Sequence, residues 1–328
     1  MRELLGQARR LTQAIKPCFL MSPPAVSQYV PAGMHFDVVI FDEASQIGPA
    51  DAVNCIYRGS ALILAGDSKQ LTPANSARGV VGDSEERPPD SGEPADPDSV
   101  FDLAKTAGPF GNHTLRWHYR SRHESLIAYS NAAFYDGRLV PVPGGGPEAG
   151  IELFYGVGTY RREPSRGNPE EAARVAQRVI HHYDSRPALS LGVVTFSESQ
   201  ASAIEAALAQ AREQRPDLDQ YFTDDRLRGF FVKNAEWVQG DERDVLILSV
   251  GYGPDENGQV GMDFGALSRQ GGWRRLNVAA TRARYRTEIV SSIRGSDIPE
   301  SVTGDGLLHL RRYLTYCGGS HPPATKAR

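Results

Sequence analysis

The sequence FDVVIFDEASQ, residues 36–46, joins a run of apolar residues to two adjacent carboxylates, Asp42 and Glu43. The apolar run predicts a strand, and the carboxylates lie where that strand would end. At the C-terminal end of a parallel strand, one acid can hold the Mg²⁺ of a nucleotide while the other orients and deprotonates an attacking water. This pattern is typical of a Walker B motif. A buried strand that ends in surface acids has the same pattern, so further motifs are needed to distinguish the two.

A second segment, ALILAGDSKQLTP at residues 61–73, has the same design. An apolar strand is followed by a Gly-Asp turn and then by Gln70. With a helical stretch between them, the two strands would form a parallel pair whose carboxyl ends share one crevice. We therefore expect Gln70 to lie beside Asp42 and Glu43.

Cleavage of a phosphoanhydride also needs cations where charge develops in the transition state, and arginine supplies a permanently charged fork. Five arginines in the second half of the chain are candidates: Arg116, Arg120 and Arg122 in TLRWHYRSR (114–122), and Arg282 and Arg284 in WRRLNVAATRARYRTEIVSS (273–292). The first three precede a predicted helix, and the last two are expected on the C-terminal part of another. Acids in the first half and arginines in the second half predict a cleft between two lobes.

The order and spacing of these segments resemble motifs II to VI of superfamily 1 helicases. The matching segments are DEASQ, GDSKQLTP, LRWHYRSR, LIAYSNAAFYDGRL (126–139), LGVVTFSESQ (191–200), EWVQGDERDVLILSV (236–250) and RRLNVAATRAR (274–284). The resemblance is strongest to the branch that contains the nonsense-mediated-decay helicase and its bacterial relatives. It implies an α/β fold of RecA-like parallel sheets with helices on both faces, as one partial lobe and a second lobe.

The resemblance also implies roles for five catalytic residues. Asp42 would hold Mg²⁺ and Glu43 would activate water. Gln70 would sense the γ-phosphate of ATP and couple it to lobe closure. Arg120 and Arg282 would reach the phosphates as arginine fingers. Asp42 and Glu43 could instead belong to a solvated strand end.

Other matched residues are expected to bind the nucleotide or the nucleic acid. Glu242, in QGDERD, matches a glutamate that reaches the ribose, and Gly240 would permit close backbone approach there. Ser22 and Thr195 match positions that touch the nucleic-acid backbone. A surface acid at Glu242 and polar turns at Ser22 and Thr195 are the alternatives. Arg284 is expected to be structural, and Arg116 and Arg122 are expected to be packing or surface groups.

The P-loop of these helicases, G-x-x-x-x-G-K-[ST], is not found in the sequence. Its backbone N–H groups and lysine cradle the phosphates. Lysine occurs only at positions 16, 69, 105, 233 and 326, and none of these follows a glycine. The residues before Asp37 are predicted to form a helix and then a strand-like segment, KPCFLMSPPAVSQY (16–29). We therefore expect the C-terminal portion of a longer helicase that begins after motif I.

The predicted organisation has three parts. Residues 1–110 form the latter part of the first lobe and include an acidic segment, 82–98, which is expected to be a mobile loop because it is rich in Pro, Asp and Glu. Residues 111–316 form the second lobe, and 317–328 form a tail.

Within these parts, alternating helical and apolar patterns indicate a parallel α/β arrangement. A short helix at 98–107 would be capped by Asp98 or Ser99. Loops are predicted at 140–150 and 251–272.

Composition limits the classes of protein. A net charge of −4 and a pI near 6.1 argue against a generally basic nucleic-acid coat, although a local channel lined by arginine stays possible. Three dispersed cysteines show neither disulfide nor zinc spacing, and no apolar run is long enough to span a membrane, so the cytoplasm is the expected location. Trp117, Trp237 and Trp273 could stack on bases, but packing is an alternative for each.

The sequence thus predicts an ATP-dependent helicase or translocase module that uses ATP and Mg²⁺ and binds single-stranded or partly duplex nucleic acid, with DNA favoured over RNA. Two alternatives stay open. One is a P-loop ATPase switch that is not a helicase. The other is a non-catalytic piece that binds nucleic acid or a partner able to complete the site.

Overall fold

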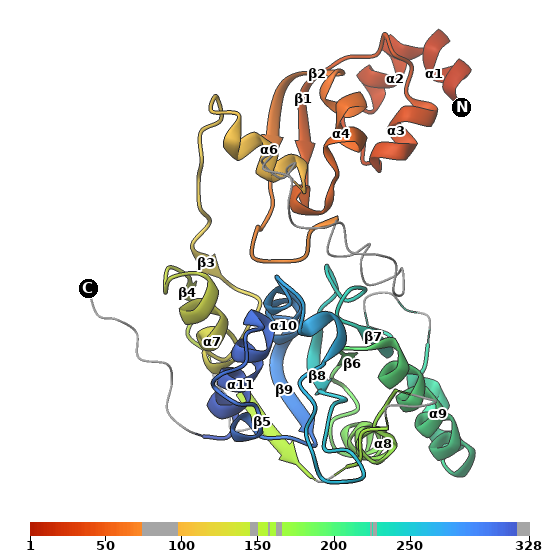
Figure 1. The fold of residues 1–328 in the computed structure, drawn as a ribbon. Helices are drawn as coiled ribbons and strands as arrows, with labels where there is room; N and C mark the ends of the chain where they lie inside the picture. The colour runs from red at the N-terminus through yellow and green to blue at the C-terminus, as the bar shows by residue number, and fades with distance from the viewer. Residues whose placement is uncertain are drawn as a thin grey trace. The chain divides into compact units, whose positions relative to one another are not determined.

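The computed structural model describes residues 1–73, 98–144, 150–156, 158–161, 166–223, 225 and 228–319. The chain divides into two compact units, Met1–His113 and Thr114–Arg328 (Figure 1). This division lies close to the boundary predicted after residue 110. Apart from Asp98, the acidic segment predicted at 82–98 lies outside the described residues, as does most of the predicted tail.

The first unit contains two parallel strands and several short helices. In chain order these are α1 (Arg2–Gln7), α2 (Arg9–Ile15), α3 (Pro23–Tyr29), β1 (Phe36–Phe41), η1 (Ala44–Gln46), α4 (Pro49–Ile56), β2 (Gly59–Leu64) and α6 (Val100–Thr106). Strands β1 and β2 pair in parallel with Phe41 opposite Leu64, and α4 connects them. The parallel pair predicted from the two apolar segments is confirmed.

The strand-like conformation predicted for residues 16–29 is wrong, because no strand is assigned at 16–22 and the following residues are helical. Residues 23–29 form α3, with Pro23 and Pro24 in its first turn. The fixed φ of proline suits the first turn of a helix, where no backbone N–H partner is needed. The predicted helix at 98–107 is confirmed as α6, and Ser99 is its cap because its hydroxyl accepts from Asp102 N at 3.1 Å.

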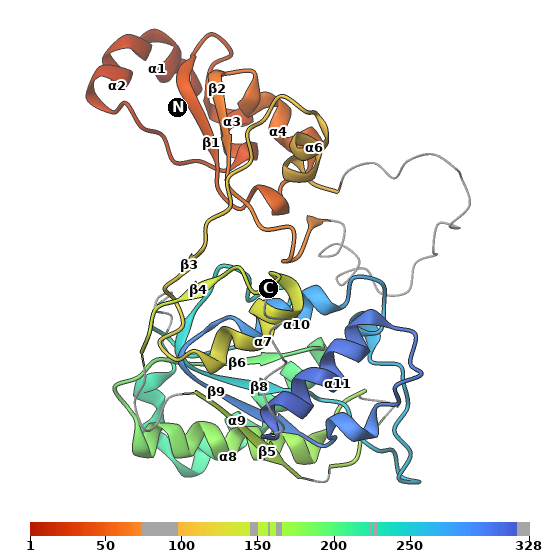
Figure 2. The same ribbon diagram turned by 90° about the vertical axis from the view of Figure 1, so that its left-hand side faces the viewer.

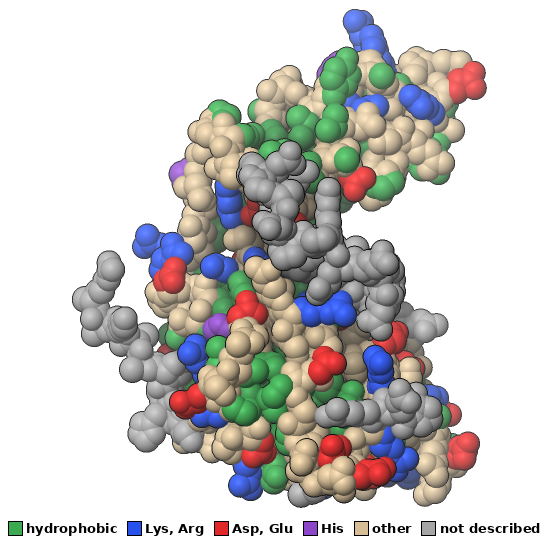
Figure 3. All heavy atoms as spheres, viewed as in Figure 1, with side chains coloured by type: hydrophobic (Ala, Val, Ile, Leu, Met, Phe, Trp, Pro, Cys, Tyr) green, Lys and Arg blue, Asp and Glu red, His purple; other side chains and the backbone are tan. Residues whose placement is uncertain are grey.

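The two faces of the β1–β2 pair differ in burial. On one face Phe41 and Leu64 pack with residues of α3, α4 and α6 in a small core. On the other face Val38, Ile40 and Ile63 are 44%, 64% and 52% exposed. Hydrophobic side chains are visible on the surface of the first unit in Figure 3. Apolar residues that point away from the core on a parallel sheet are unusual, because such sheets are normally covered on both faces.

The second unit is built on a larger sheet. Its elements are β3 (Trp117–His118), α7 (Ser125–Phe134), β4 (Val140–Pro141), β5 (Gly150–Tyr155), α8 (Pro169–Ser185), β6 (Leu191–Thr195), α9 (Glu198–Gln214), η2 (Pro216–Tyr221), β7 (Phe231–Asn234), β8 (Arg243–Ser249), η3 (Gly265–Leu267), α10 (Trp273–Ala280), β9 (Ala283–Ser291), η4 (Gly295–Asp297) and α11 (Asp305–Cys317).

Five strands of this unit form one parallel sheet in the order β5-β9-β8-β6-β7. Helices α8 and α9 cover one face, and α7 and α11 lie on the other (Figure 2). The strands β6 and β8 are buried along almost their whole length, as their continuous apolar sequences predict. The predicted α/β class with helices on both faces is confirmed for this unit.

Two further predictions need correction. Helix α10 ends at Ala280, so Arg282 lies in the following turn and Arg284 lies in strand β9, not on a helix. The β-branched residues of RTEIVSS favour a strand, and β9 is needed between β5 and β8 to complete the sheet. The loop predicted at 140–150 begins with the two-residue strand β4, while the long connection at 251–272 contains the short 3₁₀ helix η3 and an isolated antiparallel bridge between Pro254 and Val260. Among the described residues, none of the helices has both the length and the apolar character that a membrane crossing demands.

Candidate functional site

The carboxyl ends of β1 and β2 are held together by their turns. Ala65 N donates to Phe41 O at 2.8 Å, and Ala44 N donates to Ala65 O at 2.8 Å. The backbone N–H of Asp67 donates to Ser45 Oγ at 3.3 Å. A Cβ added at Gly66 would lie 3.0 Å from the Ser45 nitrogen, so a side chain there would crowd this close approach. The two turns therefore form one edge.

Asp42 and Glu43 lie at this edge. Asp42 is exposed, and its Oδ1 accepts the Glu43 N–H at 3.0 Å. Glu43 has a left-handed backbone, with φ of 52°, which is uncommon for a residue other than glycine and is often found at functional sites. Gln46 Nε2 donates to Glu43 Oε2 at 3.0 Å and holds the carboxylate in place. This supporting role of Gln46 was not predicted. Its position three residues after Glu43 could have suggested the contact.

Gln70 lies on the turn that follows β2. Its backbone N–H donates to Asp67 O at 3.1 Å, and its side chain donates to Asp67 Oδ2 at 2.9 Å. The first unit thus brings the two acids and the Gln70 turn to one sheet edge. No group of three or more metal-binding side chains occurs in the described part of the chain. Mg²⁺ is commonly bound through one or two carboxylates together with substrate phosphates, and a role for Asp42 as its ligand stays a prediction.

In the second unit, Glu242 lies between two arginines. Arg120 Nε donates to Glu242 Oε2 at 2.7 Å. Arg284 Nε donates to Glu242 Oε1 at 3.1 Å, and Arg284 Nη2 donates to the same oxygen. Partial burial raises the pKa of Glu242, but the hydrogen bonds from Arg284 and Arg120 outweigh that effect and leave the pKa below its usual value. Glu242 is therefore a carboxylate at neutral pH.

The backbone brings these three residues together. Arg122 N donates to Arg284 O at 2.7 Å, which joins the segment before α7 to the start of β9. Gly240 precedes Glu242 with a φ of 87°, and a Cβ there would meet no atom within 4 Å. The left-handed backbone therefore accounts for this glycine, and close approach of a ligand to Gly240 stays a prediction.

Arg282 is placed differently from Arg120. Its side chain is 2% exposed, with Nε donating to Val278 O at 3.0 Å and Nη2 donating to Thr281 Oγ1 at 3.1 Å. Burial, together with the charges of Arg120 and Arg282, lowers the pKa of His118 to about 4. Both arginines therefore act on the same neutral imidazole, and a finger role for Arg282 stays a prediction.

The two residues predicted to contact nucleic acid differ in access. Ser22 is exposed at the start of α3. Thr195 is fully buried, and its hydroxyl donates to Ser197 O at 2.8 Å, as a polar turn residue would. Contact of either residue with a strand is untested.

The three tryptophans also differ. Trp117 and Trp237 are 70% and 60% exposed, whereas Trp273 stacks on Phe134 at a centroid distance of 4.9 Å. Packing therefore explains Trp273 and leaves the other two accessible.

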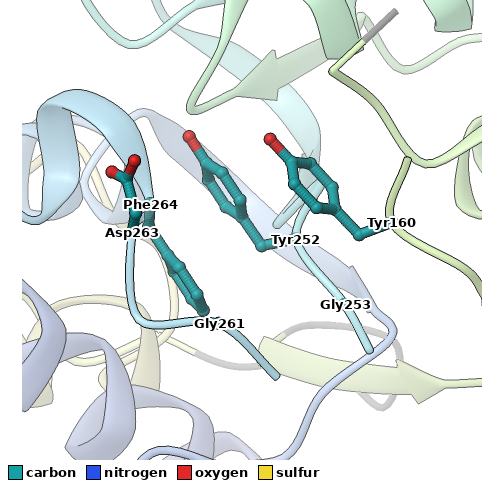
Figure 4. A pocket seen from close by; sticks show the side chains of 6 residues that line it. All are labelled: Tyr160, Tyr252, Gly253, Gly261, Asp263 and Phe264. Atoms are coloured by element: carbon teal, nitrogen blue, oxygen red, sulfur yellow. The ribbon is translucent and has the colours of Figure 1, made fainter. Parts of the chain in front are cut away.

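A small pocket lies elsewhere in the second unit. Its lining residues are Tyr160, Tyr252, Gly253, Gly261, Asp263 and Phe264 (Figure 4). The rings of Tyr252 and Phe264 stack at 4.4 Å, and Tyr160 lies 5.3 Å from Tyr252. No residue predicted from the sequence to form a site lines this pocket.

Comparison with known proteins agrees with the motifs. Residues 154–294 match a family described as an AAA domain. An uncharacterised ATP-dependent helicase of Mycoplasma genitalium is 35% identical over 299 residues, which cover 86% of this chain and 25% of that protein. The chain is a relative of ATP-dependent helicases. The probable helicase MAGATAMA 3 of Arabidopsis thaliana is 29% identical over 276 residues, covering 78% of this chain and 30% of that protein. The helicase SEN1 of Saccharomyces cerevisiae is 24% identical over 301 residues, covering 85% and 12%.

The chain spans about a quarter of the length of the Mycoplasma genitalium protein and of its Mycoplasma pneumoniae homologue, both named as uncharacterised ATP-dependent helicases. The predicted resemblance to helicases is confirmed.

Proposed function

We propose that this chain is the module of a superfamily 1 helicase or translocase that hydrolyses ATP and moves along a nucleic-acid strand. The observation that carries the proposal is the edge shared by β1 and β2, where a braced acid pair and the Gln70 turn lie together. Its support is the similarity to ATP-dependent helicases over most of the chain.

Each residue has a defined task in this proposal. Asp42 is the exposed carboxylate that holds Mg²⁺, which neutralises phosphate charge when bound. Glu43, oriented by Gln46, takes a proton from the attacking water. Gln70 responds to the γ-phosphate. Arg120 and Arg282 stabilise the charge that develops on the phosphoryl group.

Glu242 is proposed to bind the ribose. Closing and reopening of the two lobes during ATP turnover would move two phosphate-gripping surfaces along one strand of nucleic acid.

The partner is single-stranded or partly duplex nucleic acid, and DNA is favoured because relatives include proteins named as DNA-binding or as a DNA replication helicase/nuclease. The cytoplasm is the proposed location, because the cysteines Cys18, Cys55 and Cys317 are all free thiols.

The phosphate cradle is proposed to come from polypeptide that is not part of this 328-residue sequence, since no G-x-x-x-x-G-K-[ST] run occurs in it. The exposed face of β1–β2, with Val38, Ile40 and Ile63, is where we expect the added polypeptide to pack. Covering that face would give the pair the two-sided burial that parallel sheets normally have.

The isolated chain is therefore expected to hydrolyse ATP very poorly. Acid and water ligands without a phosphate cradle cannot hold the nucleotide in line for attack. The steady-state rate of phosphate release measures this hydrolysis. It is compared between the chain alone and the chain joined to a P-loop region, which is called the joined protein below. Robust turnover by the chain alone that Glu43→Gln abolishes would contradict the proposal that the cradle comes from elsewhere.

A change at Ile63 tests where the added polypeptide packs. In the isolated chain, Ile63→Ser should change the free energy of unfolding by less than about 0.5 kcal/mol, because the side chain is already exposed. In the joined protein the same change should cost about 2 kcal/mol, because the side chain becomes buried. Leu62→Ser is the matched control, since Leu62 packs against the core and should be costly in both proteins. Equal effects of Ile63→Ser in the two proteins would show that this face stays open.

Stimulation of ATP hydrolysis by single strands, together with unwinding of a partial duplex, separates a helicase from an ATPase switch. Both activities are expected in the joined protein. Turnover that is independent of any strand would favour the switch.

A further inference from the structure

The second unit contains a chain of ion pairs in which one carboxylate faces two arginines from different parts of the sequence. Glu242 directly precedes β8, Arg120 lies in the segment before α7, and Arg284 lies in β9. Each carboxylate oxygen has its own arginine: Oε2 accepts from Arg120 and Oε1 accepts from Arg284. Glu242 is thus fully engaged by cations on both sides.

Arg284 is anchored more firmly than Arg120. Its Nη1 lies 3.8 Å from Asp244 Oδ1 in addition to its contacts with Glu242. Asp244 is itself fixed, because its Oδ2 accepts from Ser190 N at 3.0 Å and from Ser190 Oγ at 2.8 Å. Arg284 therefore links Glu242 to the start of β6.

Arg120 has a different environment. Within the described residues, Arg120 forms its ion pair with Glu242. The side chains of Arg120 and Glu242 are 29% and 33% exposed, so a ligand can reach the pair from solvent. A partly exposed pair of this kind is worth only about 1 kcal/mol, so the phosphates of a nucleotide, which carry more charge, can displace the carboxylate.

We propose that Arg284 is a positioning residue that holds Glu242. In this proposal Glu242 holds Arg120 in an ion pair until the phosphates of a nucleotide displace the carboxylate. This inference rests on the proposed function, in which Arg120 is a phosphate-binding finger. Phosphate binding frees the Oε2 of Glu242 for a ribose hydroxyl while Arg284 keeps Oε1 in place. The ion pair thus links release of Arg120 to recognition of the sugar.

A ligand without a sugar separates the two tasks of Glu242. The probe is Mg²⁺-tripolyphosphate, and its binding to the joined protein that carries a P-loop is measured by calorimetry. Glu242→Gln should bind tripolyphosphate about fivefold more tightly than the unmodified protein, because no carboxylate competes for Arg120. The same variant should bind ATP more weakly, because the ribose contact is lost.

Asp241→Asn is the matched control. It removes one negative charge from the neighbouring residue, whose carboxylate pairs with Lys233 at 2.6 Å and not with Arg120. Its affinity for tripolyphosphate should be unchanged. Equal affinities of Glu242→Gln and the unmodified protein for tripolyphosphate would show that Glu242 does not compete with phosphate for Arg120. An equal gain in tripolyphosphate affinity in Asp241→Asn would overturn the proposal as well.

Arg284 is tested through its dependence on Glu242. Arg284→Ala should raise the KM for ATP about fivefold with a smaller change in kcat, and Arg284→Lys should restore only part of the loss because lysine lacks the two-donor fork. In the Glu242→Gln background, Arg284→Ala should add nothing. A full additional effect in that background would show that Arg284 acts independently of Glu242.

A second measurement, made on the 328-residue chain, does not depend on nucleotide. The Nε–H signal of Arg120 in ¹⁵N NMR should be protected from exchange, lose protection in Glu242→Gln and lose part of it in Arg284→Ala. An unchanged signal in both variants would contradict the ion-pair arrangement. Absence of nucleotide binding with these NMR changes present would instead contradict the proposed function.

Discussion

Replacing Arg120 or Arg282 with alanine in the joined protein should lower the kcat for ATP hydrolysis on the order of 10³-fold, as expected for groups that stabilise charge in phosphoryl transfer. Nucleotide affinity should fall far less than turnover, because the developing charge is greatest in the transition state and binding in the ground state depends mainly on the P-loop. Single-turnover and steady-state kinetics give the two quantities separately.

Arg116→Ala is the contrast for these variants. Arg116 is exposed and directly precedes β3, and its replacement should change kcat only slightly. The two fingers should also differ in stability. Arg120 is partly exposed, whereas Arg282 is buried and donates to Val278 O and Thr281, so Arg282→Ala should lower the melting temperature more. If Arg116→Ala abolished turnover while Arg120→Ala left it intact, the alignment of LRWHYRSR with the helicase motif would be out of register.

Replacing Glu171 with alanine should cost about 3–5 kcal/mol in the free energy of unfolding of the second unit, because it removes the acceptor at the centre of a buried network. Glu171 Oε1 accepts from Ser249 Oγ at 2.8 Å and from Gly251 N at 2.7 Å. Its Oε2 accepts from Ser292 N at 3.0 Å and from Ser292 Oγ at 2.8 Å. The network joins the start of α8 to the ends of β8 and β9, and its loss would leave buried N–H groups unpaired.

Glu170→Ala is the matched control for this change. Glu170 is the preceding residue of α8, its side chain is 47% exposed, and its nearest arginine contact is 3.8 Å long. Its replacement should cost less than about 0.5 kcal/mol. Chemical denaturation of both variants measures the difference, and equal stability of the two would show that the network contributes nothing.

Stability should also depend on pH through Glu171. Burial raises the pKa of Glu171 to about 7 from an ordinary value of 4.5, although four hydrogen bonds oppose the shift. Between these values the folded chain holds a proton that the unfolded chain releases. The stability contributed by this group is therefore complete below pH 4.5 and is lost as pH rises to about 7, by at most about 1.4 kcal/mol per pH unit. Glu171→Gln should remove this slope, and an unchanged slope would assign it to other groups.

Much of the fold follows from local patterns in the sequence. The apolar segments around 36–41 and 61–64 predicted β1 and β2, and their parallel pairing followed from the helical stretch between them. The same kind of pattern predicted β6 and β8, because strands covered on both faces need continuous apolar sequence. The errors occurred where a local signal was ambiguous. Residues 23–29 formed a helix through their prolines, and the helix predicted to reach Arg284 ended at Ala280.

The sequence by itself determined which chemical groups the protein carries and in what order: two acids after one strand, a glutamine after the next, and arginines later in the chain. Their contacts were decided by tertiary structure. Arg120 and Glu242 are 122 residues apart in sequence, and Arg284 meets Glu242 because β8 and β9 are neighbours in the sheet. Strand order depends on how whole strands and helices pack, which no local pattern encodes. The burial of Thr195 and Arg282 and the exposure of Ile40 and Ile63 have the same origin.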